Sequence, residues 1–464
     1  MSYKKPSFSS LSVVLLLSLL VLQANAQTQH ETTIKKIYDE ALLRGQSYPM
    51  LTYLTTKIGA RLSGSPQAAA AVEWSRHIMQ HYGFDSVWLQ PVLVPHWVRG
   101  EKEVAIIQSK IRSNVPVNVL ALGGSIGTGT AGVQAQIVEV KDFEELKTLG
   151  EKNVKGKIVF FNRPMDATKI QTFAAYGGAV NQRGAGPSEA AKYGAVAAIV
   201  RSMGSNSEEY AHTGGLRYAP NVGKIPAVAI STKHADLLSE ILRAEKEVTV
   251  YIRTTCETLP DAPSFNVIGE IKGKEFPKEY IVVSGHLDSW DVGQGAHDDG
   301  AGCVQAIEAL RLLKQIGYQP RYTIRAVMYM NEENGLRGGI EYAKQADLKK
   351  EKHLAAMESD RGGFTPRGFT MSVPDKTKAL VQSWKPMLEP YGLTDFGQEG
   401  GGADIGPLGP LGVPLFGYLP DSQRYFDYHH TQEDTIDKVN KRELELGAAA
   451  MAALTFLIDS TGLK

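Results

Sequence analysis

The chain has 464 residues, of which 43% are hydrophobic and 22% are charged, a composition ordinary for a soluble globular protein. This length allows two or three domains with a sizeable core. Lys and Arg together number 50, as do Asp and Glu, so the formal net charge is zero and no long-range field favours nucleic acid or an anionic membrane.

The N-terminus has the pattern of a secretory signal peptide. Lys4 and Lys5 precede an apolar stretch over residues 11–22, and an A-x-A cleavage signal ends at Ala26. That stretch is too short for a comfortable membrane span. We therefore expect residues 1–26 to be removed and the mature chain to be exported, to the periplasm or the extracellular medium, without membrane attachment. An uncleaved anchor is the alternative.

The first part of the mature chain is expected to be mainly helical. Helical segments fill residues 32–84, with an ordered turn between helices at residues 58–65. Strand-like segments follow at residues 87–94 and 104–108. We assign both strands to the same central sheet as the later strands of the chain.

The character of the sequence changes near residue 123. Glycines crowd the beginning of this stretch, and short β-rich pieces follow as far as residue 252. We interpret residues 123–252 as an inserted β-rich domain. A catalytic domain then flanks it in two parts, residues 27–122 and 253–464.

Three later segments are apolar runs interrupted only by Ser284 and Arg325, at residues 281–284, 324–330 and 354–357. Continuous rather than alternating apolar character is typical of strands that helices cover on both faces. The predicted fold class is therefore α/β, with a mixed, mostly parallel central sheet flanked by helices. Open α/β sheets bind ligands beyond the carboxyl ends of their strands, so the polar residues after these segments should converge. Those residues are His286, Glu332, Glu333 and Asp360.

Asp298 and His430 complete a set that could hold two zinc ions. Zinc accepts imidazole nitrogen and carboxylate oxygen, and catalytic zinc keeps a position open for water or substrate. His286 with Asp360 could bind one ion. His430 with Glu333 could bind the other, which leaves Asp298 to bridge them. Two such ions polarise a scissile carbonyl and lower the pKa of a shared water, which is the chemistry of peptide-bond hydrolysis.

Glu332 and Asp288 are expected to support this chemistry. In an extended segment Glu332 projects away from its neighbour Glu333, so it is free to take a proton from the water and pass it to the leaving amine. Asp288 lies two residues after His286 and could accept a hydrogen bond from the non-ligating imidazole nitrogen. Such a contact fixes the orientation of a metal-bound histidine.

Three further residues are candidates for contacts with the substrate. Arg361 could bind a substrate carboxylate or form a surface salt bridge. His429 could donate to a developing oxyanion or pack against the ligand loop. Asp404 lies in a glycine-rich loop, residues 399–406, that we expect to shape the pocket.

Helical periodicity returns after the Asp298 loop and again over residues 441–459. Asp298 or Asp299 could therefore simply cap the first of these helices.

Cys256 and Cys303 are too few for a disulfide framework. Two separate buried thiols are favoured, and a single bridge is the alternative.

The segments at residues 284–300, 332–333, 358–360 and 426–431 resemble the co-catalytic di-zinc exopeptidases that include bacterial zinc aminopeptidases. The resemblance runs from residue 59 to the C-terminal helix. Metallopeptidases that hydrolyse dipeptides or remove succinyl groups use the same ligand order but a much longer segment between the first His and the bridging Asp. The 12 positions here (298 minus 286) favour the first group.

This resemblance implies two Zn²⁺ per chain, with Asp298 as the bridging ligand and Glu332 as the general base. It also implies a cis peptide between Asp298 and Asp299, and a protease-associated-like insert that overhangs the site and helps to form a homodimer. The implied activity is hydrolysis of dipeptides or short peptides with a free N-terminus, or alternatively aminopeptidase action on longer peptides. Arg361 departs from the small residue expected after Asp360. The implied zinc ligands are His286, Asp298, Glu333, Asp360 and His430.

Other functions and metals compete with this interpretation. Residues 123–127 fit the G-x-S-x-G motif of serine hydrolases, but that motif needs a helix directly after the serine, and glycine and threonine follow here. A binding protein that had lost its ligands is a second alternative, which the complete ligand set disfavours. Manganese and cobalt fit similar oxygen-rich sites.

Overall fold

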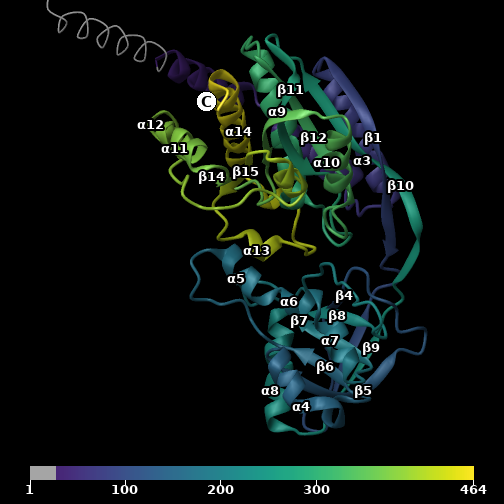
Figure 1. Cartoon of the computed structure of the whole chain (residues 1–464). Helices are drawn as coiled ribbons and strands as arrows, with labels where there is room; N and C mark the ends of the chain where they lie inside the picture. The colour runs from purple at the N-terminus through teal and green to yellow at the C-terminus, as the bar shows by residue number, and fades with distance from the viewer. Residues whose placement is uncertain (1–27, 464) are drawn as a thin grey trace, which may run out of the picture.

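The computed structural model describes residues 28–463, which form two units (Figure 1). The main unit consists of residues 28–98 and 257–463, and the inserted unit contains residues 104–253. The predicted signal peptide, residues 1–26, lies outside the described residues.

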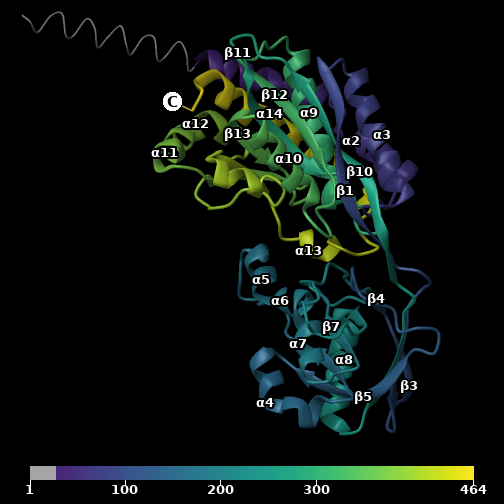
Figure 2. The same cartoon turned by 45° about the vertical axis from the view of Figure 1, so that its right-hand side comes forward.

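The two units are connected by a pair of long antiparallel strands, β1 (Ser86–Val98) and β10 (Glu257–Ile271). β1 runs from the sheet of the main unit toward the inserted unit, and β10 returns from the inserted unit to that sheet, as Figure 2 also shows. The chain therefore leaves and re-enters the main unit at one place.

The main unit contains a seven-stranded sheet in the order β1-β10-β12-β11-β13-β15-β14. Three of its six strand pairs are parallel, namely β11 with β12, β11 with β13, and β13 with β15. The other three pairs are antiparallel, so the sheet is mixed as predicted but less parallel than expected. The remaining strands are β11 (Phe276–His286), β12 (Tyr322–Tyr329), β13 (Lys352–Glu358), β14 (Pro366–Ser372) and β15 (Leu415–Pro420).

Both faces of the central strands are buried, which explains their continuous apolar sequences. On β11, Ile281 and Val283 pack into the larger hydrophobic core, together with Leu310 of α9 and Leu454 of α14. The residue between them, Val282, packs into a second core formed with α10 and η4. The bounds of these helices are α9 (Ala301–Gln315), α10 (Arg337–Leu348), α14 (Lys441–Thr461) and the 3₁₀ helix η4 (Gly406–Leu411).

The helices predicted for the main unit are present. A helix covers residues 28–44, and α2 (Ser47–Tyr53), the π-helix η1 (Leu54–Ile58) and α3 (Pro66–His81) follow, with a turn before α3. α14 is apolar enough to span a membrane, but 83% of its most apolar window is buried within the protein. It is a core helix.

Both cysteines, Cys256 and Cys303, are free and buried, so no bridge joins them.

The inserted unit contains a second sheet, of eight strands in the order β3-β2-β9-β5-β6-β7-β8-β4. β2 (Val104–Ser109) lies in this sheet, so its predicted assignment to the main sheet was wrong. Its residues alternate between buried and partly exposed, a pattern that does not identify which sheet a strand joins. The unit is also more helical than the β-rich domain expected. Its other elements are β3 (Ser113–Val117), β4 (Val119–Ala121), β5 (Val133–Val140), β6 (Ile158–Phe161), β7 (Ala197–Arg201), β8 (Ala227–Ile230), β9 (Thr249–Arg253), α4 (Phe143–Val154), α5 (Thr172–Ala179), α6 (Asn181–Gly184), α7 (Gly186–Lys192) and α8 (Thr232–Ala244).

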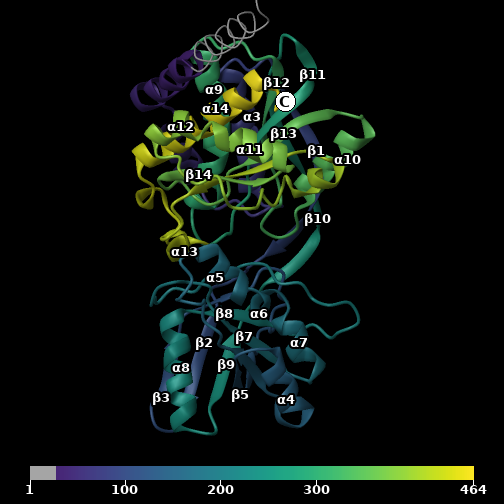
Figure 3. The same ribbon diagram turned by 60° about the vertical axis from the view of Figure 1, so that its left-hand side comes forward.

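The units meet at a seam where α5 of the inserted unit faces α13 (Tyr425–Tyr428) of the main unit, as the three views agree (Figure 3). The Phe173 ring lies 5.1 Å from that of Tyr425 and 4.9 Å from that of Phe426. The Thr172 hydroxyl donates to the Ser422 carbonyl at 2.9 Å. These contacts bring the inserted unit against the loop that carries His430.

Candidate metal centre

Five side chains from five separate segments come together at the carboxyl ends of the parallel strands. His286 is the last residue of β11, Glu333 follows β12, and Asp360 follows β13. Asp298 lies in a short π-helix, η2 (Ala296–Gly300), and His430 follows α13. All of these side chains are at least three-quarters buried, the most exposed being Asp360 at 24%. The peptide bond between Asp298 and Asp299 is cis.

Asp298 lies between the two imidazoles. Its Oδ1 is 3.2 Å from His286 Nε2, and its Oδ2 is 3.2 Å from His430 Nε2. His286 Nε2 is also 3.4 Å from Asp360 Oδ1, and His430 Nε2 is 3.1 Å from Glu333 Oε2. Each imidazole therefore has Asp298 on one side and a second carboxylate on the other, the pairing that the sequence suggested.

The donor set fits metal ions. His286 Nε2, Asp298 Oδ2 and Glu333 Oε1 are buried and make no hydrogen bond with any residue in 28–463. One ligand atom from each of His286, Asp298 and Glu333 lies within 4.8 Å of the others, and a second such group contains Asp360. Buried polar atoms without hydrogen bonds are rare and need a partner, and cations would supply it.

The electrostatics of the site also favour cations. Burial, and then the neighbouring Asp298 carboxylate, raise the pKa of Glu333 well above its usual value. Burial, and then Asp360 and Glu333, do the same for Glu332. The pKa of Asp298 is well below its usual value because His286 and His430 outweigh its burial. So many acidic groups in one buried place require either protons or cations.

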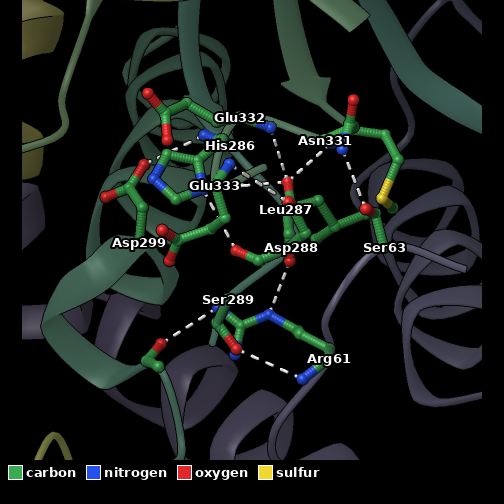
Figure 4. Close-up of polar contacts among 12 residues, drawn as sticks. Arg61, Ser63, His286, Leu287, Asp288, Ser289, Asp299, Asn331, Glu332 and Glu333 are labelled. Atoms are coloured by element: carbon green, nitrogen blue, oxygen red, sulfur yellow. Dashed lines mark hydrogen bonds and ion pairs between the residues drawn. The ribbon is translucent and has the colours of Figure 1, made fainter. Parts of the chain in front are cut away.

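Asp288 supports the site differently from the prediction. The Nδ1 of His286 bonds the main-chain carbonyl of Asp288 at 3.1 Å, while the carboxylate is 3.9 Å away. That carboxylate instead accepts from the backbone N–H groups of Asn331 at 2.7 Å and Glu332 at 3.1 Å (Figure 4). Asp288 therefore holds the segment that carries Glu332 and Glu333 against the end of β11.

Two residues that the sequence did not single out hold the Asp298 loop. The buried Arg61 guanidinium donates to the carbonyls of Leu287 at 2.6 Å, Gln294 at 2.8 Å and Gly295 at 2.9 Å. Asp434 accepts from the backbone N–H of Asp298 at 3.1 Å. Arg61 lies in the turn that carries the family resemblance, whereas no local pattern distinguishes Asp434.

Asp299 does not face the imidazoles in the way that Asp298 does. Its Oδ1 accepts from the Gly302 N–H at 2.9 Å in the first turn of α9, and its Oδ2 accepts from the His286 N–H at 3.0 Å. The predicted helix-capping role therefore describes Asp299 and not Asp298.

A cavity of about 680 Å³ opens beside the five side chains, and both units line it. Glu332, Asp360 and His430 contribute from the main unit, and Tyr176 and Arg183 from the inserted unit. A peptide bound in this cavity would contact both units. Its size is in the range of small-molecule sites.

An adjoining pocket of about 250 Å³ shares Asp360 with the cavity and contains Arg361. The Arg361 guanidinium lies 4.8 Å from the centre of the Phe173 ring, and it makes no hydrogen bond or ion pair within the described chain. The glycine-rich loop contributes Gly401 to Ala403 to this pocket. Asp404 itself is buried beside the pocket, and neither of its carboxylate oxygens has a hydrogen-bond partner in residues 28–463.

His429 packs against the ligand loop. Its ring stacks on His430 with centroids 3.5 Å apart, and its Nε2 lies 3.8 Å from Asp298 Oδ2. Burial, and then the neighbouring His430, lower the pKa of His429 well below its usual value, so the ring is neutral.

The serine-hydrolase motif has no catalytic surroundings. Ser125 is 1% exposed, and no helix follows it. Its hydroxyl accepts from the Ala227 N–H at 2.9 Å and donates to the Ile126 carbonyl at 3.0 Å. Ser125 is a structural residue of the inserted unit.

Comparison with known proteins agrees with this geometry. Residues 266–455 match peptidase family M28. The chain is 35% identical to carboxypeptidase Q of Bos taurus over 422 residues, which cover 91% of this chain and 86% of that protein. The sequence segments that resemble the di-zinc exopeptidases lie within the 422 aligned residues or beside them, so both comparisons point to the same group of enzymes.

Solved structures extend the similarity to the fold. A peptidase M28 precursor from Shewanella amazonensis is 35% identical, covers 93% of this chain and 97% of its own, and superposes with a TM-score of 0.88. A zinc aminopeptidase from Bacillus subtilis, 20% identical, shares the fold with a TM-score of 0.63 over 89% of this chain and 94% of its own. The chain therefore belongs to peptidase family M28, and it is a zinc-dependent exopeptidase.

Proposed function

We propose that this enzyme binds two zinc ions per chain and hydrolyses dipeptides or short peptides with a free N-terminus. The observation that supports this most strongly is the position of Asp298, with one oxygen toward each imidazole beside a cavity that both units line. His286 and Asp360 would hold one ion, and His430 and Glu333 the other, with Asp298 between them. Two zinc ions would polarise the scissile carbonyl and lower the pKa of the attacking water.

Glu332 acts as the general base in this proposal. Its side chain lines the cavity and is held in place by the backbone contact of its N–H with Asp288. It accepts a proton from the attacking water and then donates it to the nitrogen of the leaving amine. His429, neutral and beside Asp298, is placed to donate to the developing oxyanion.

Arg361 binds a carboxylate of the substrate. Its guanidinium has no anionic partner within 4 Å among residues 28–463, lies over the Phe173 ring, and faces a pocket continuous with Asp360. Arginine pairs well with carboxylates because two N–H groups can donate in parallel. The Glu358 carboxylate accepts from the backbone N–H groups of Ala403 at 2.8 Å and Ile405 at 2.9 Å, which holds the glycine-rich loop, with Asp404 in it, beside this pocket.

The inserted unit is a protease-associated-like domain in this proposal, and the enzyme is an exported homodimer. We take this unit to run from near residue 104, where the first strand of its sheet begins, to near residue 253, where the last one ends, instead of the predicted residues 123–252. Sedimentation equilibrium that gave the mass of a single chain would reject the dimer.

Metal analysis combined with a substrate panel tests the proposal. We expect two zinc ions per chain, turnover of Ala-Ala and Ala-Ala-Ala, no turnover of N-acetyl-Ala-Ala, and loss of activity with a chelator that zinc restores. A fluorophosphonate should have no effect. A zinc-loaded enzyme that cleaved none of the free dipeptides or tripeptides would contradict the proposal.

A further inference from the structure

We propose that the inserted unit is part of the metal centre, because one of its loops positions the ligand His430. This inference rests on the proposed role of His430. The loop, residues 202–216 and called the strap below, runs between β7 and β8 of the inserted unit. It crosses the seam to the segment that carries His429 and His430.

The backbone of His430 has a conformation that needs support. Its φ is +63°, in the left-handed region that residues other than glycine adopt at a cost. Such residues persist where the surroundings hold them in place, and they cluster at functional sites. A metal ligand in this conformation therefore depends on the contacts made by its neighbours.

Thr213 of the strap makes two of those contacts. Its N–H donates to the carbonyl of His430 at 3.0 Å, and its own carbonyl lies 3.2 Å from His430 Nδ1. A carbonyl can only accept, so Nδ1 carries the proton and Nε2 keeps a free lone pair. That Nε2 is the atom that faces Asp298 and Glu333. The inserted unit thus sets both the ring orientation and the tautomer, as a second-shell partner of a metal-bound histidine does.

His212 holds the preceding residue. Its Nδ1 donates to the carbonyl of His429 at 2.9 Å, and its Nε2 lies 2.7 Å from the carboxylate of Glu208. His212 is 1% exposed and Glu208 is 5% exposed, so water does not compete for these contacts. The pair fixes the main chain on the N-terminal side of His430.

The strap is in turn attached to the sheet of the inserted unit. The Ser202 hydroxyl accepts from the His212 N–H at 2.8 Å and donates to the carbonyl of Ile230, at the end of β8, at 2.7 Å. Gly204 packs so closely that an added Cβ would lie 2.9 Å from His212 Nε2. A continuous set of hydrogen bonds therefore connects this sheet to the loop that carries His430. Displacement of the strap should weaken the binding of the zinc ion at His430 and leave the binding of the other ion unchanged.

Stepwise zinc binding to the full-length chain tests this inference. In His212→Ala we expect one ion to bind as in the wild type and the other to bind about 10- to 100-fold more weakly, the range typical of lost second-shell contacts. His212→Asn, whose amide N–H can replace Nδ1–H, should restore much of the loss. The matched control is Thr172→Ala, which removes another buried hydrogen bond across the same seam and should bind both ions normally. Competition with a chromophoric chelator measures both steps.

The outcomes separate this inference from the proposed function. The inference would be overturned if His212→Ala bound both ions with unchanged affinity, or if it bound both ions equally more weakly. It would also be overturned if Thr172→Ala lost as much affinity as His212→Ala. Should His212→Ala fail to fold, Gly204→Ala displaces the same pair and carries the same expectation. A wild-type chain that bound no zinc would instead overturn the proposed function.

Discussion

At the scale of single residues, the different surroundings of Asp298 and Glu332 suit the different tasks that we propose for them. Asp298 has an imidazole beside each oxygen, and these imidazoles lower its pKa, so it stays ionised. Glu332 faces the cavity, and burial and nearby carboxylates raise its pKa. The proposed arrangement, an ionised bridging carboxylate beside a proton acceptor of raised pKa, is suited to hydrolysis near neutral pH.

Glu332→Gln tests the role of the base. Turnover should fall by about 10²–10⁴-fold, the usual contribution of a general base, because an amide cannot accept the proton of the water. Zinc content should stay unchanged, since Glu332 is not a proposed ligand. The control is Glu341→Gln, which changes a glutamate on α10 that pairs with Lys344. Retained turnover in Glu332→Gln would assign the base to another group.

Arg361→Gln tests carboxylate recognition. A lost charged hydrogen bond of about 2 kcal/mol would raise KM roughly 30-fold for the substrate that carries the recognised carboxylate. Ala-Ala against its C-terminal amide, and Asp-Ala against Asn-Ala, distinguish the C-terminal carboxylate from an acidic side chain. Arg367→Gln, which removes an exposed partner of Asp421, is the control. An equal KM change for all four substrates would argue against a carboxylate contact.

At the scale of helices and strands, the sequence predicted best where burial leaves a clear pattern. The later parts of β11, β12 and β13 are mainly apolar because both of their faces are covered, and the residues at or just after their ends, His286, Glu333 and Asp360, were therefore identified with them. β2 was assigned to the wrong sheet because its alternation shows one buried face but not its partner strand.

The strap could not be predicted from the sequence. His212 and the carbonyl that it contacts are 217 residues apart in the chain, and only the fold brings them together. His212, Thr213 and Asp434 also lie outside any local motif. The residues that position the proposed ligands are recognised only from contacts in the structure. The proposed ligands themselves are recognised in the sequence from their spacing and residue type.

His353 of β13 should make the fold sensitive to acid. Burial, and then Arg325, lower its pKa to about 4, and its Nε2 contacts the Tyr342 hydroxyl at 2.9 Å. The pKa of an unfolded histidine is about 6.5. Between these values the unfolded chain binds a proton that the folded chain does not. The free energy of unfolding should therefore fall as the pH falls, by up to about 1.4 kcal/mol per pH unit.

Chemical unfolding at pH 7 and pH 5, with a chelator present to remove metal effects, checks this expectation. His353→Gln should lose less stability over this interval than the wild type does. His81→Gln, at an exposed position on α3, should behave as the wild type. An equal loss in wild type and His353→Gln would show that His353 does not contribute.

At the scale of the whole molecule, two units rather than one line the cavity beside the proposed metal centre. The five proposed ligands belong to the main unit, while the cavity wall and the contacts of His430 come partly from the inserted unit. Zinc should therefore stabilise the fold across the seam as well as around the ligands.

Metal removal should lower the melting temperature. A ligand that binds only the folded state adds about 2.7 kcal/mol of stability at a free concentration 100 times its Kd. Thermal unfolding of the wild type with chelator and then with excess zinc measures this shift. A double variant, His286→Ala with His430→Ala, should show little or no shift on zinc addition. A wild-type melting temperature that zinc did not change would contradict metal binding at this site.

Anomalous diffraction at the zinc absorption edge, from crystals of the zinc-loaded enzyme, tests most directly whether the five side chains bind two ions. We expect two peaks about 3.5–4 Å apart, the usual spacing of two-metal sites. One peak should touch His286 and Asp360, the other His430 and Glu333, with Asp298 between them. A single peak, or peaks away from these five side chains, would contradict the proposed two-zinc site.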